Sequence, residues 1–299
     1  MQEISFKKIL IGFAFSPNLK ANVFEAIRLA DFFGAHLYFL HVGSKSVSKE
    51  QTLNNLLEEA PIKLKRISVI WQEEKPVETI VDQCKKNEID LLLLGAMQRE
   101  NMVKFYMGSI ARKLTRKAPC SVLLMIKPSI IRKPSQHVVV NAFESQQTKT
   151  TINFAFYFAQ ALGIPKLTLV EEIDRSEVAA LAYDDRSLRK VTLQKEKLKR
   201  RELSRIREIL HHIPDDLKKS TQVHLQNIFG TRGYSIGHYA KVVRADLLVM
   251  NAAETRRSFL ERIFPKDLEH ILSELPTDVL IIQTKENLSL IHISEPTRP

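Results

Sequence analysis

The chain has 299 residues, which is enough for two domains of ordinary size. Hydrophobic residues make up 44% of it and charged residues 26%, a balance typical of soluble globular proteins, and no apolar run reaches the roughly 18 residues of a membrane-spanning helix. The formal net charge is +11, but no nucleic-acid-binding signature accompanies it, so we interpret the charge mainly as a solvated basic surface. We therefore expect no membrane span and no specific nucleic-acid partner.

The N-terminus and the cysteines indicate the compartment. The first residues lack the basic segment, apolar stretch and cleavage site of a signal peptide. The only cysteines are Cys84 and Cys120, and no Cys/His cluster has metal-ligand spacing. These features favour a reducing cytoplasm without structural disulfides or a bound metal. We expect both thiols to be packed and inert.

The first part of the chain alternates predicted strands and helices. Short apolar runs indicate buried parallel strands, and apolar residues at helical spacing indicate amphipathic helices. Gly34 is expected to end the first helix, and Pro76 is tolerated in the first turn of another. The predicted elements are a strand at Lys7–Phe15, a helix at Ala21–Phe33, a strand at Ala35–Val42, a helix at Lys45–Ala60, a strand at Lys65–Trp71, a helix at Pro76–Asn87 and a strand at Asp90–Leu94. Strands separated by helices predict βαβ units and a parallel sheet.

The stretch from Asp90 to Met125 predicts an anion site. Its strand ends at Gly95, a helix opens at Gly108-Ser109, and a second apolar strand covers Ser121 to Met125. A glycine lets a ligand approach the backbone closely. The free N–H groups and the dipole at a helix start favour a bound anion by roughly 0.3–1 kcal/mol. Many helices begin Gly-Ser, so the specific signal is the spacing.

That spacing resembles the nucleotide motif of the universal stress protein family. The motif runs glycine, two residues, glycine, nine residues, then glycine with serine or threonine. Gly95, Gly108 and Ser109 fall in register with it, whereas Gln98 replaces the second glycine. The family's ending, a helix followed by Ala-Pro-Cys and an apolar strand, is matched by Ala118-Pro119-Cys120. The chain thus resembles a tandem, two-domain member of this family.

The resemblance implies an α/β fold with two tandem Rossmann-like domains of the adenine nucleotide alpha hydrolase-like type. Each would be a five-stranded, parallel, doubly wound sheet. The two would pair within the chain as the family's dimers do, with a homodimer and an unknown protein partner also open. Ligands of such sheets bind beyond the carboxyl ends of the strands. The implied cofactor is ATP or another adenine nucleotide, with contacts from Phe13, Ala14, Val42, Leu94, Gly95, Gln98, Arg99, Gly108, Ser109 and Ile110.

Several positions depart from the family pattern. The family's Asp at the end of strand one is Ala14 here, which removes a polar contact to adenosine, while Val42 near the adenine is retained. A Gly-x-Pro before one helix has become Glu74-Lys75-Pro76. The side chain of Gln98 either fills the space of the phosphates or donates its amide to them.

Basic residues follow the site along the predicted helix. Arg112 and Arg116, like Lys113 and Lys117, are spaced four residues apart. Such pairs repel each other unless an anion or an acidic group lies between them. The alternative interpretation is a solvated helix face.

The second part of the chain repeats the first. Residues 128–136 contain two prolines and form the predicted linker between domain 1 at 1–127 and domain 2 at 137–284. Domain 2 has predicted strands at His137–Phe143, Lys166–Glu171, Thr221–Asn227, Asp246–Met250 and Leu275–Ile282 and a helix at Thr150–Leu162. Its motif is degenerate, with Asn251 and Glu254 at the glycines and Phe264-Pro265 at Gly-Ser. We interpret this half as structural or partner-binding.

Domain 2 also carries an insertion that predicts a long basic helix over 175–213. Ten basic residues between Arg186 and Arg207 stand against two acidic residues, Glu196 and Glu202. Apolar residues recur at helical spacing in its last part, namely at Leu203, Ile206, Leu210 and Ile213. The helix is either a surface helix packed on the sheet or a docking arm for an acidic partner or membrane surface.

We find no nucleophile–base pair, paired carboxylates or metal set, so no enzyme is expected. His41 is interpreted as a strand residue with local hydrogen bonds. The predicted function is a cytoplasmic stress-response regulator that binds nucleotide in domain 1 only. The alternatives are a nucleotide-free interaction module and the cytosolic regulatory part of a larger transporter. The first strand follows Met1 closely, which argues against a membrane part before it.

The last residues form a separate case. Leu288 to Arg298 resembles a translated sequencing adapter, so we treat 285–299 as a tail that is an artefact from 288 onward, and exclude it from fold reasoning. The gene would then be cut near residue 287.

Overall fold

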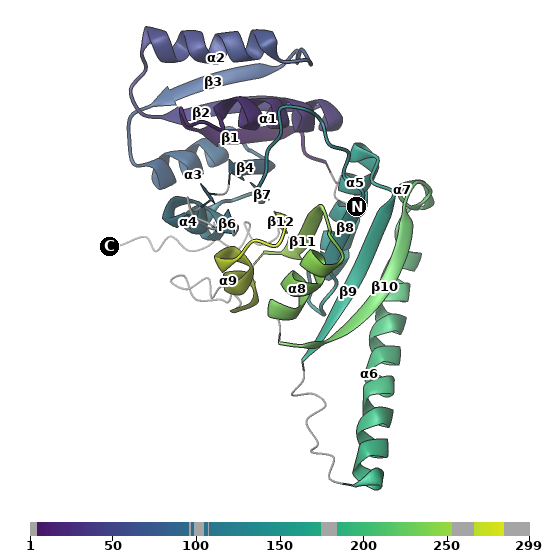
Figure 1. Ribbon diagram of the computed structural model, residues 1–299. Helices are drawn as coiled ribbons and strands as arrows, with labels where there is room; N and C mark the ends of the chain where they lie inside the picture. Colours follow the sequence, from purple (N-terminus) through teal and green to yellow (C-terminus); the bar gives the residue numbers. More distant parts are fainter. Residues whose placement is uncertain are drawn as a thin grey trace, which may run out of the picture.

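The computed structural model describes residues 5–95, 97–98, 105–106, 108–174, 184–231, 233–252 and 266–283. Ten of its strands form one sheet in the order β10-β9-β8-β11-β12-β7-β4-β1-β2-β3, flanked by helices (Figure 1). The two halves have the same five-stranded order, which runs in opposite directions along the sheet. The repeat in the sequence therefore corresponds to a repeat in the fold.

The first half has the strand order β3-β2-β1-β4-β7, and every pair within it is parallel. This confirms the predicted doubly wound sheet. A small hairpin follows β4 and was not predicted from the sequence. Its two strands, of two residues each, are β5 (Met97–Gln98) and β6 (Phe105–Tyr106). The other elements are β1 (Lys8–Phe13), α1 (Leu19–Phe33), β2 (His36–Val42), α2 (Val47–Glu59), β3 (Ile67–Gln72), α3 (Pro76–Lys86), β4 (Leu91–Gly95), α4 (Ser109–Lys117) and β7 (Ser121–Met125).

The second half repeats this order as β10-β9-β8-β11-β12, again with parallel pairs only. Its elements are β8 (His137–Asn141), α5 (Thr148–Leu162), β9 (Lys166–Asp174), α6 (Asp185–His211), α7 (Asp215–Lys218), β10 (Gln222–Gly230), α8 (Tyr234–Val242), β11 (Leu247–Asn251), α9 (Lys266–Ser273) and β12 (Asp278–Ile282). The fold class predicted for the whole chain is therefore confirmed.

The two halves meet where β7 pairs antiparallel with β12, with Leu123 opposite Leu280. The backbone N–H of Ile126 donates to Asp278 Oδ1 at 2.8 Å, and the N–H of Gln283 donates to Ser121 Oγ at 3.1 Å. Because this pair is antiparallel, the carboxyl ends of the two sets of strands face opposite edges of the continuous sheet. The two halves thus present their ligand-binding edges in opposite directions.

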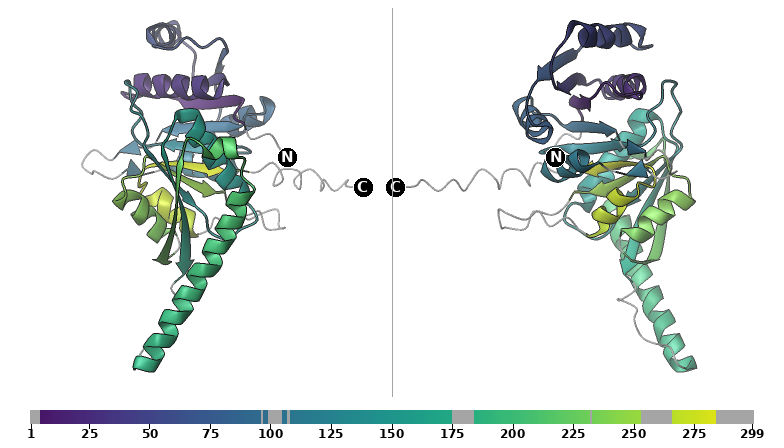
Figure 2. Two further views of the ribbon diagram at one scale, coloured as in Figure 1. Left: turned by 90° about the vertical axis from the view of Figure 1, so that its right-hand side faces the viewer. Right: turned by 60° about the vertical axis from the view of Figure 1, so that its left-hand side comes forward.

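Helices cover both faces of the sheet (Figure 2). One apolar core lies under α1, α2, α5 and the C-terminal part of α6, and a second lies under α3, α4, α8 and α9. Aromatic side chains join the halves on the first face, where the ring of Phe6 lies 5.3 Å from that of Phe154 and 5.9 Å from that of Tyr157. The pairing of the halves therefore rests on packed side chains as well as on the β7–β12 ladder.

The local signals behave as the sequence predicted. Gly34 takes the left-handed conformation (φ 60°) that ends α1, and Pro76 is the first residue of α3. The linker runs beside α1, where Arg28 Nη1 donates to the carbonyl oxygen of Ile130 at 3.0 Å. None of the described helices is long and apolar enough to cross a membrane.

The insertion helix is shorter than predicted. Asp184 caps α6 by accepting a hydrogen bond from the N–H of Ser187 at 2.7 Å, and the Ser187 side chain bonds back to complete a capping box. The helix therefore begins at Asp185 rather than at 175, and it ends at His211 rather than at 213. Residues 175–183 and the tail from 284 lie outside the described residues.

Candidate functional site

The predicted crevice lies at the carboxyl ends of β1, β2 and β4. β1 is hydrogen-bonded to both neighbours, and Phe13 at its end stands opposite His41. Ala14 and Gly95 are exposed just there, Val42 is half-buried, and Leu94 is buried beneath them. The fold therefore brings these predicted residues to one edge of the sheet, where Ala14 and Gly95 are open to solvent.

Helix α4 begins beside this edge. Its N-cap is Gly108, which offers no side-chain hydrogen bond to the first turn. Ser109 is exposed, and the side chain of Ile110 is 46% exposed. The first N–H groups of a helix have no partner within the helix, and their partial positive charge attracts anions. The start of α4 is thus an accessible site for an anionic group.

The two glycines of the motif are not required by the backbone. Gly108 has φ −62° and ψ 161°, which any residue adopts. A Cβ at Gly95 would meet only Asn22 Oδ1, at an ordinary contact distance of 3.4 Å. What the glycines provide at these positions is therefore room over the backbone.

Asn22 of α1 is a polar residue at this site that sequence analysis missed. Its Oδ1 atom is buried and has no hydrogen-bond partner among the described residues. An amide can present either its oxygen or its nitrogen to a neighbour. A weak signal exists in the sequence, since Asn22 lies one turn into the helix that follows the first strand. Only the fold shows that it faces Gly95.

Gln98 and Arg99 are the remaining predicted contacts. Gln98 lies in β5, with its backbone opposite Phe105 in β6. Arg99 lies outside the described residues. The roles assigned to all these side chains therefore stay predictions.

Four aromatic rings gather at the ends of β1, β2 and β3, where we expect the adenosine, and they belong to Phe13, Phe15, His41 and Trp71. The rings of Phe15 and Trp71 are stacked at 6.2 Å, and His41 lies 5.1 Å from each of them. His41 Nδ1 is 3.1 Å from the carbonyl oxygen of Phe13, a local hydrogen bond as predicted for this residue. None of these residues is acidic, whereas the family has an acidic contact at this place.

In the second half, the chain's own side chains occupy the corresponding places. Asn251 ends β11 as Gly95 ends β4, and its Nδ2 atom donates to Ser145 Oγ at 2.7 Å. The buried carboxylate of Glu172 accepts hydrogen bonds from the N–H groups of Gly233 at 2.8 Å and Ile236 at 3.1 Å. A carboxylate therefore already sits at the start of α8, which follows β10 as α3 follows β3, whereas the counterpart of α4 is α9. Glu254 and Phe264-Pro265 lie outside the described residues.

A buried ion-pair cluster fastens α6 to the same edge of the second half. Arg205 Nη2 donates to the carbonyl oxygen of Ala142 at 2.6 Å and pairs with Glu171, and Arg205 Nε donates to Glu202 at 2.9 Å. Burial raises the pKa of Glu171 to about 8, against the opposing attraction of Arg205. The cluster thus places a guanidinium and two carboxyl groups over the ends of β8 and β9.

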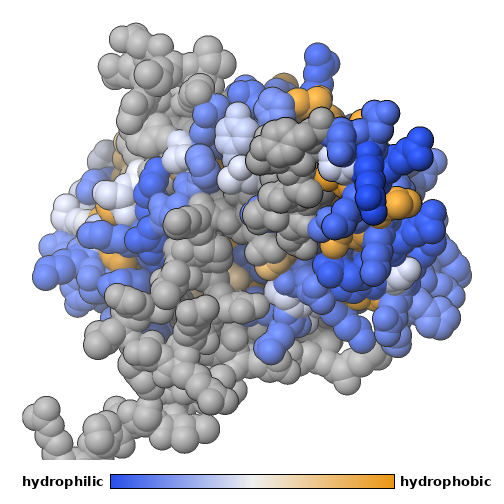
Figure 3. Space-filling view, turned by 90° about the horizontal axis from the view of Figure 1, so that it is seen from below, coloured by the Kyte–Doolittle hydropathy of each residue, from blue (hydrophilic) through white to orange (hydrophobic). Residues whose placement is uncertain are grey.

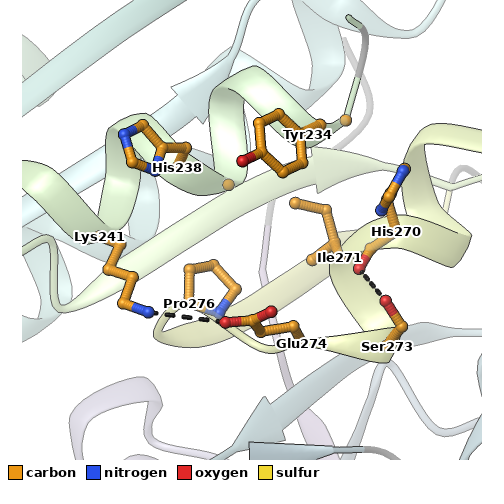
Figure 4. Close-up of a pocket in the computed structure, with 10 residues that line it drawn as sticks. Tyr234, His238, Lys241, His270, Ile271, Ser273, Glu274 and Pro276 are labelled. Carbon is orange, nitrogen blue, oxygen red and sulfur yellow. Dashed lines mark hydrogen bonds and ion pairs between the residues drawn. The ribbon is translucent and has the colours of Figure 1, made fainter. Parts of the chain in front are cut away.

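A separate groove of about 410 Å³ lies between α8 and α9 (Figure 4). Tyr234 and His238 stack with ring centroids 6.3 Å apart, and Lys241 Nζ lies 3.6 Å from Glu274 Oε1. The groove is on the helical face rather than at the strand ends, so it is not the predicted crevice.

Among the described residues, the His, Cys, Asp and Glu side chains form no group of three that could hold a metal ion. Cys84 and Cys120 are free and buried, as predicted. A hydrogen bond with Cys84 and burial raise the pKa of Cys120 well above its usual value, so this thiol is held in its unreactive protonated form.

Comparisons with known proteins agree with the fold. Residues 44–125 match the model of the Universal stress protein family. A universal stress protein of Methanocaldococcus jannaschii is 26% identical over 142 residues, which cover 41% of this chain and 84% of that protein. Together with the motif register of Gly95, Gly108 and Ser109, these matches show that the first half of the chain contains a universal stress protein domain.

Solved structures extend the likeness in fold to the whole chain. A functionally unknown protein from Pseudomonas aeruginosa PAO1 is 16% identical, with 95% of both chains covered and a TM-score of 0.69. A universal stress protein from Archaeoglobus fulgidus is 14% identical, with 92% of this chain and 98% of that chain covered and a TM-score of 0.61. The cytoplasmic domain of a prokaryotic cation chloride cotransporter is 15% identical, with 95% and 98% covered and a TM-score of 0.51. At these identities the likeness concerns the fold alone.

Proposed function

We propose that the first half binds an adenine nucleotide, ATP or a related one, and that the chain is a cytoplasmic, non-catalytic regulator of a stress response. The observation that supports this most is the open start of α4, where Gly108 and Ser109 present an uncapped helix N-terminus beside Gly95. The phosphates would lie there, held by backbone N–H groups and the helix dipole. Asn22 would add a polar contact beside Gly95.

The same proposal limits binding to one nucleotide per chain. In the second half, the side chain of Asn251 stands where the first half has Gly95, and it donates to Ser145. The carboxylate of Glu172 lies in β9 at the same edge, and Arg205, Glu171 and Glu202 cover the neighbouring strand ends. Occupied space and the charge of a buried carboxylate therefore both oppose a second nucleotide.

The test begins with the full chain purified without added nucleotide. The protein is denatured, and any released small molecule is identified by chromatography and mass spectrometry. The nucleotide-free protein is then titrated with ATP, ADP and AMP by calorimetry. About one adenine nucleotide per chain would support the proposal. No released nucleotide and no titration heat at millimolar ligand would overturn it.

A nucleotide-free interaction module is the second candidate. The observation that favours it is the aromatic cluster of Phe15, His41 and Trp71 next to Ala14, which leaves no acidic partner for a ribose. A third candidate is the regulatory part of a larger transporter, favoured by the likeness in fold to a cotransporter's cytoplasmic domain. The titration above separates the first candidate from the second.

A further inference from the structure

Helix α6 stands partly outside the body of the protein. It has 27 residues, which gives a length of about 40 Å. Its C-terminal part is held by Ile206, which is fully buried, and by the Arg205 ion pairs. Its N-terminal part extends past the ends of β9 and β10 and away from the sheet (Figure 1; Figure 2). The last aromatic ring that it reaches is Phe229, which lies 5.7 Å from Lys195 Nζ and 5.9 Å from Lys199 Nζ.

The outward face of this N-terminal part carries a row of cations. At 100° per residue, its members fall within a sector of roughly 100° on the side opposite the buried Ile206. All of them are exposed, and none of them forms an ion pair with another described residue. We call this row the α6 basic stripe, and it consists of Arg186, Arg189, Lys190, Lys197 and Arg200. The acidic Glu196 lies off the stripe and pairs with Lys199 at 3.1 Å.

One apolar side chain sits in the middle of the stripe. Leu193 is 71% exposed and lies along the helix between Lys190 and Lys197. The stripe from Arg186 to Arg200 is about 21 Å long. The described part of the face seen from below is mostly hydrophilic, with scattered apolar side chains (Figure 3). A helix with aligned cations and one central apolar side chain suits a partner that carries anionic groups around an apolar side chain.

We infer that the α6 basic stripe is a docking surface for an acidic segment of another protein, one that carries carboxylates around an apolar side chain. Carboxylates would pair with the five cations, and an apolar residue would cover Leu193. A second copy of this chain is not the partner, because two identical stripes would repel each other in a chain with net charge +11.

Two other anionic surfaces fit less well. A helix that lies on a membrane buries a broad apolar face, whereas the stripe offers only Leu193. A phosphate backbone would neutralise the cations but would give Leu193 no apolar contact. The surface is also distinct from the proposed nucleotide site, because the carboxyl edges of the two halves face opposite ways.

The experiment uses the full chain and a fluorescent peptide of about twenty residues, rich in glutamate with a central leucine. The same peptide with glutamine in place of glutamate, a DNA duplex of equal length and phosphatidylglycerol vesicles serve as comparison ligands. The test variant is Arg189→Glu, Lys197→Glu and Arg200→Glu together, since glutamate keeps helix propensity. The matched control is Lys65→Glu, Lys85→Glu and Lys113→Glu, three exposed cations of the first half with the same change in net charge.

The expected result is binding of the acidic peptide that weakens by roughly tenfold or more in the α6 variant and by much less in the control. Leu193→Ala should weaken binding severalfold without loss of helix by circular dichroism. Equal weakening in both triple variants would show only attraction by net charge and would overturn the proposal. Tighter binding of DNA or vesicles than of the peptide would overturn it in favour of those partners, and no peptide binding at low salt would also reject it.

Discussion

Arg112 of α4 and Glu269 of α9 lie 3.6 Å apart between Nη1 and Oε2, and the same carboxylate pairs with Arg116. The two arginines are one turn apart and belong to the first half, whereas the glutamate belongs to the second. The second half thus provides the acidic group that lies between the two mutually repelling arginines of the first half. Arg112 Nη2 also donates to the carbonyl oxygen of Leu272 at 3.3 Å. Of the two interpretations of this pair, the one with an acidic group between the cations is therefore confirmed, although both arginine side chains stay partly exposed.

Reversing the charge of Glu269 should therefore weaken the pairing of the halves. Glu269→Lys would gather three cations at the α4–α9 contact, and we expect the free energy of unfolding to fall by about 1 kcal/mol, because the pair is partly exposed. Denaturant unfolding measures this. The swapped double variant Arg116→Glu with Glu269→Lys should recover part of the loss, and no recovery would show that this ion pair does not contribute.

Glu171 should make stability depend on pH. Its pKa in the folded chain is about 8 against a usual value of 4.5, because burial next to Glu202 outweighs Arg205. Between those values the folded chain holds one proton more than the unfolded chain. The contribution of Glu171 to the free energy of unfolding therefore falls as pH rises through this window, by at most about 1.4 kcal/mol per pH unit.

The variant Glu171→Gln should lack this slope. Denaturant unfolding at several pH values between 5 and 8, in steps of about one unit, would compare the two proteins. We expect Glu171→Gln to gain stability relative to the natural chain as pH rises. Glu196→Gln, an exposed glutamate on α6, is the control and should run parallel to the natural chain. A parallel profile for Glu171→Gln as well would contradict the raised pKa.

Glu172 should be important for the second half to fold. Its carboxylate accepts two backbone hydrogen bonds at the start of α8 while buried. Glu172→Ala would leave those N–H groups without an acceptor, and we expect a loss of roughly 2–3 kcal/mol in the free energy of unfolding. Glu144→Ala removes an exposed carboxylate near the same edge and should have little effect. Similar effects of the two changes in denaturant unfolding would reject this role.

Gly108→Asp should abolish nucleotide binding in the first half without unfolding it. Aspartate is a good N-cap residue, so α4 should be kept or stabilised by about 1 kcal/mol. Its carboxylate would then occupy the helix start and repel phosphate. Calorimetry with ATP measures the loss, and Lys117→Asp at the far end of α4 is the control. Affinity that survives Gly108→Asp would place the nucleotide elsewhere.

Much of the fold could be predicted because its signals are local. Apolar runs such as Ser121–Met125 become buried strands at the predicted positions, and Gly34 and Pro76 mark helix ends by their backbone preferences. The start of the insertion helix was less predictable, because it depends on the capping box that Asp184 forms with Ser187.

Some features of the candidate site could also be predicted from the sequence, and others could not. The register of Gly95, Gly108 and Ser109 could be read along the chain, because the motif depends on spacing. The unpartnered Asn22, the aromatic cluster around His41 and the internal anion of Glu172 could not, because each depends on elements that are distant in sequence.

Two repeats of a parallel, doubly wound sheet follow from the amino-acid pattern alone, since strand and helix periods and glycine positions are properties of short segments. The joining of the repeats into one sheet by β7 and β12, and the pairing of Glu269 with Arg112 and Arg116, follow only from the folded arrangement. It alone decided that Arg205 fastens one end of α6 and leaves the basic stripe outside. These outcomes depend on burial and on contacts between distant residues, which a linear pattern does not contain.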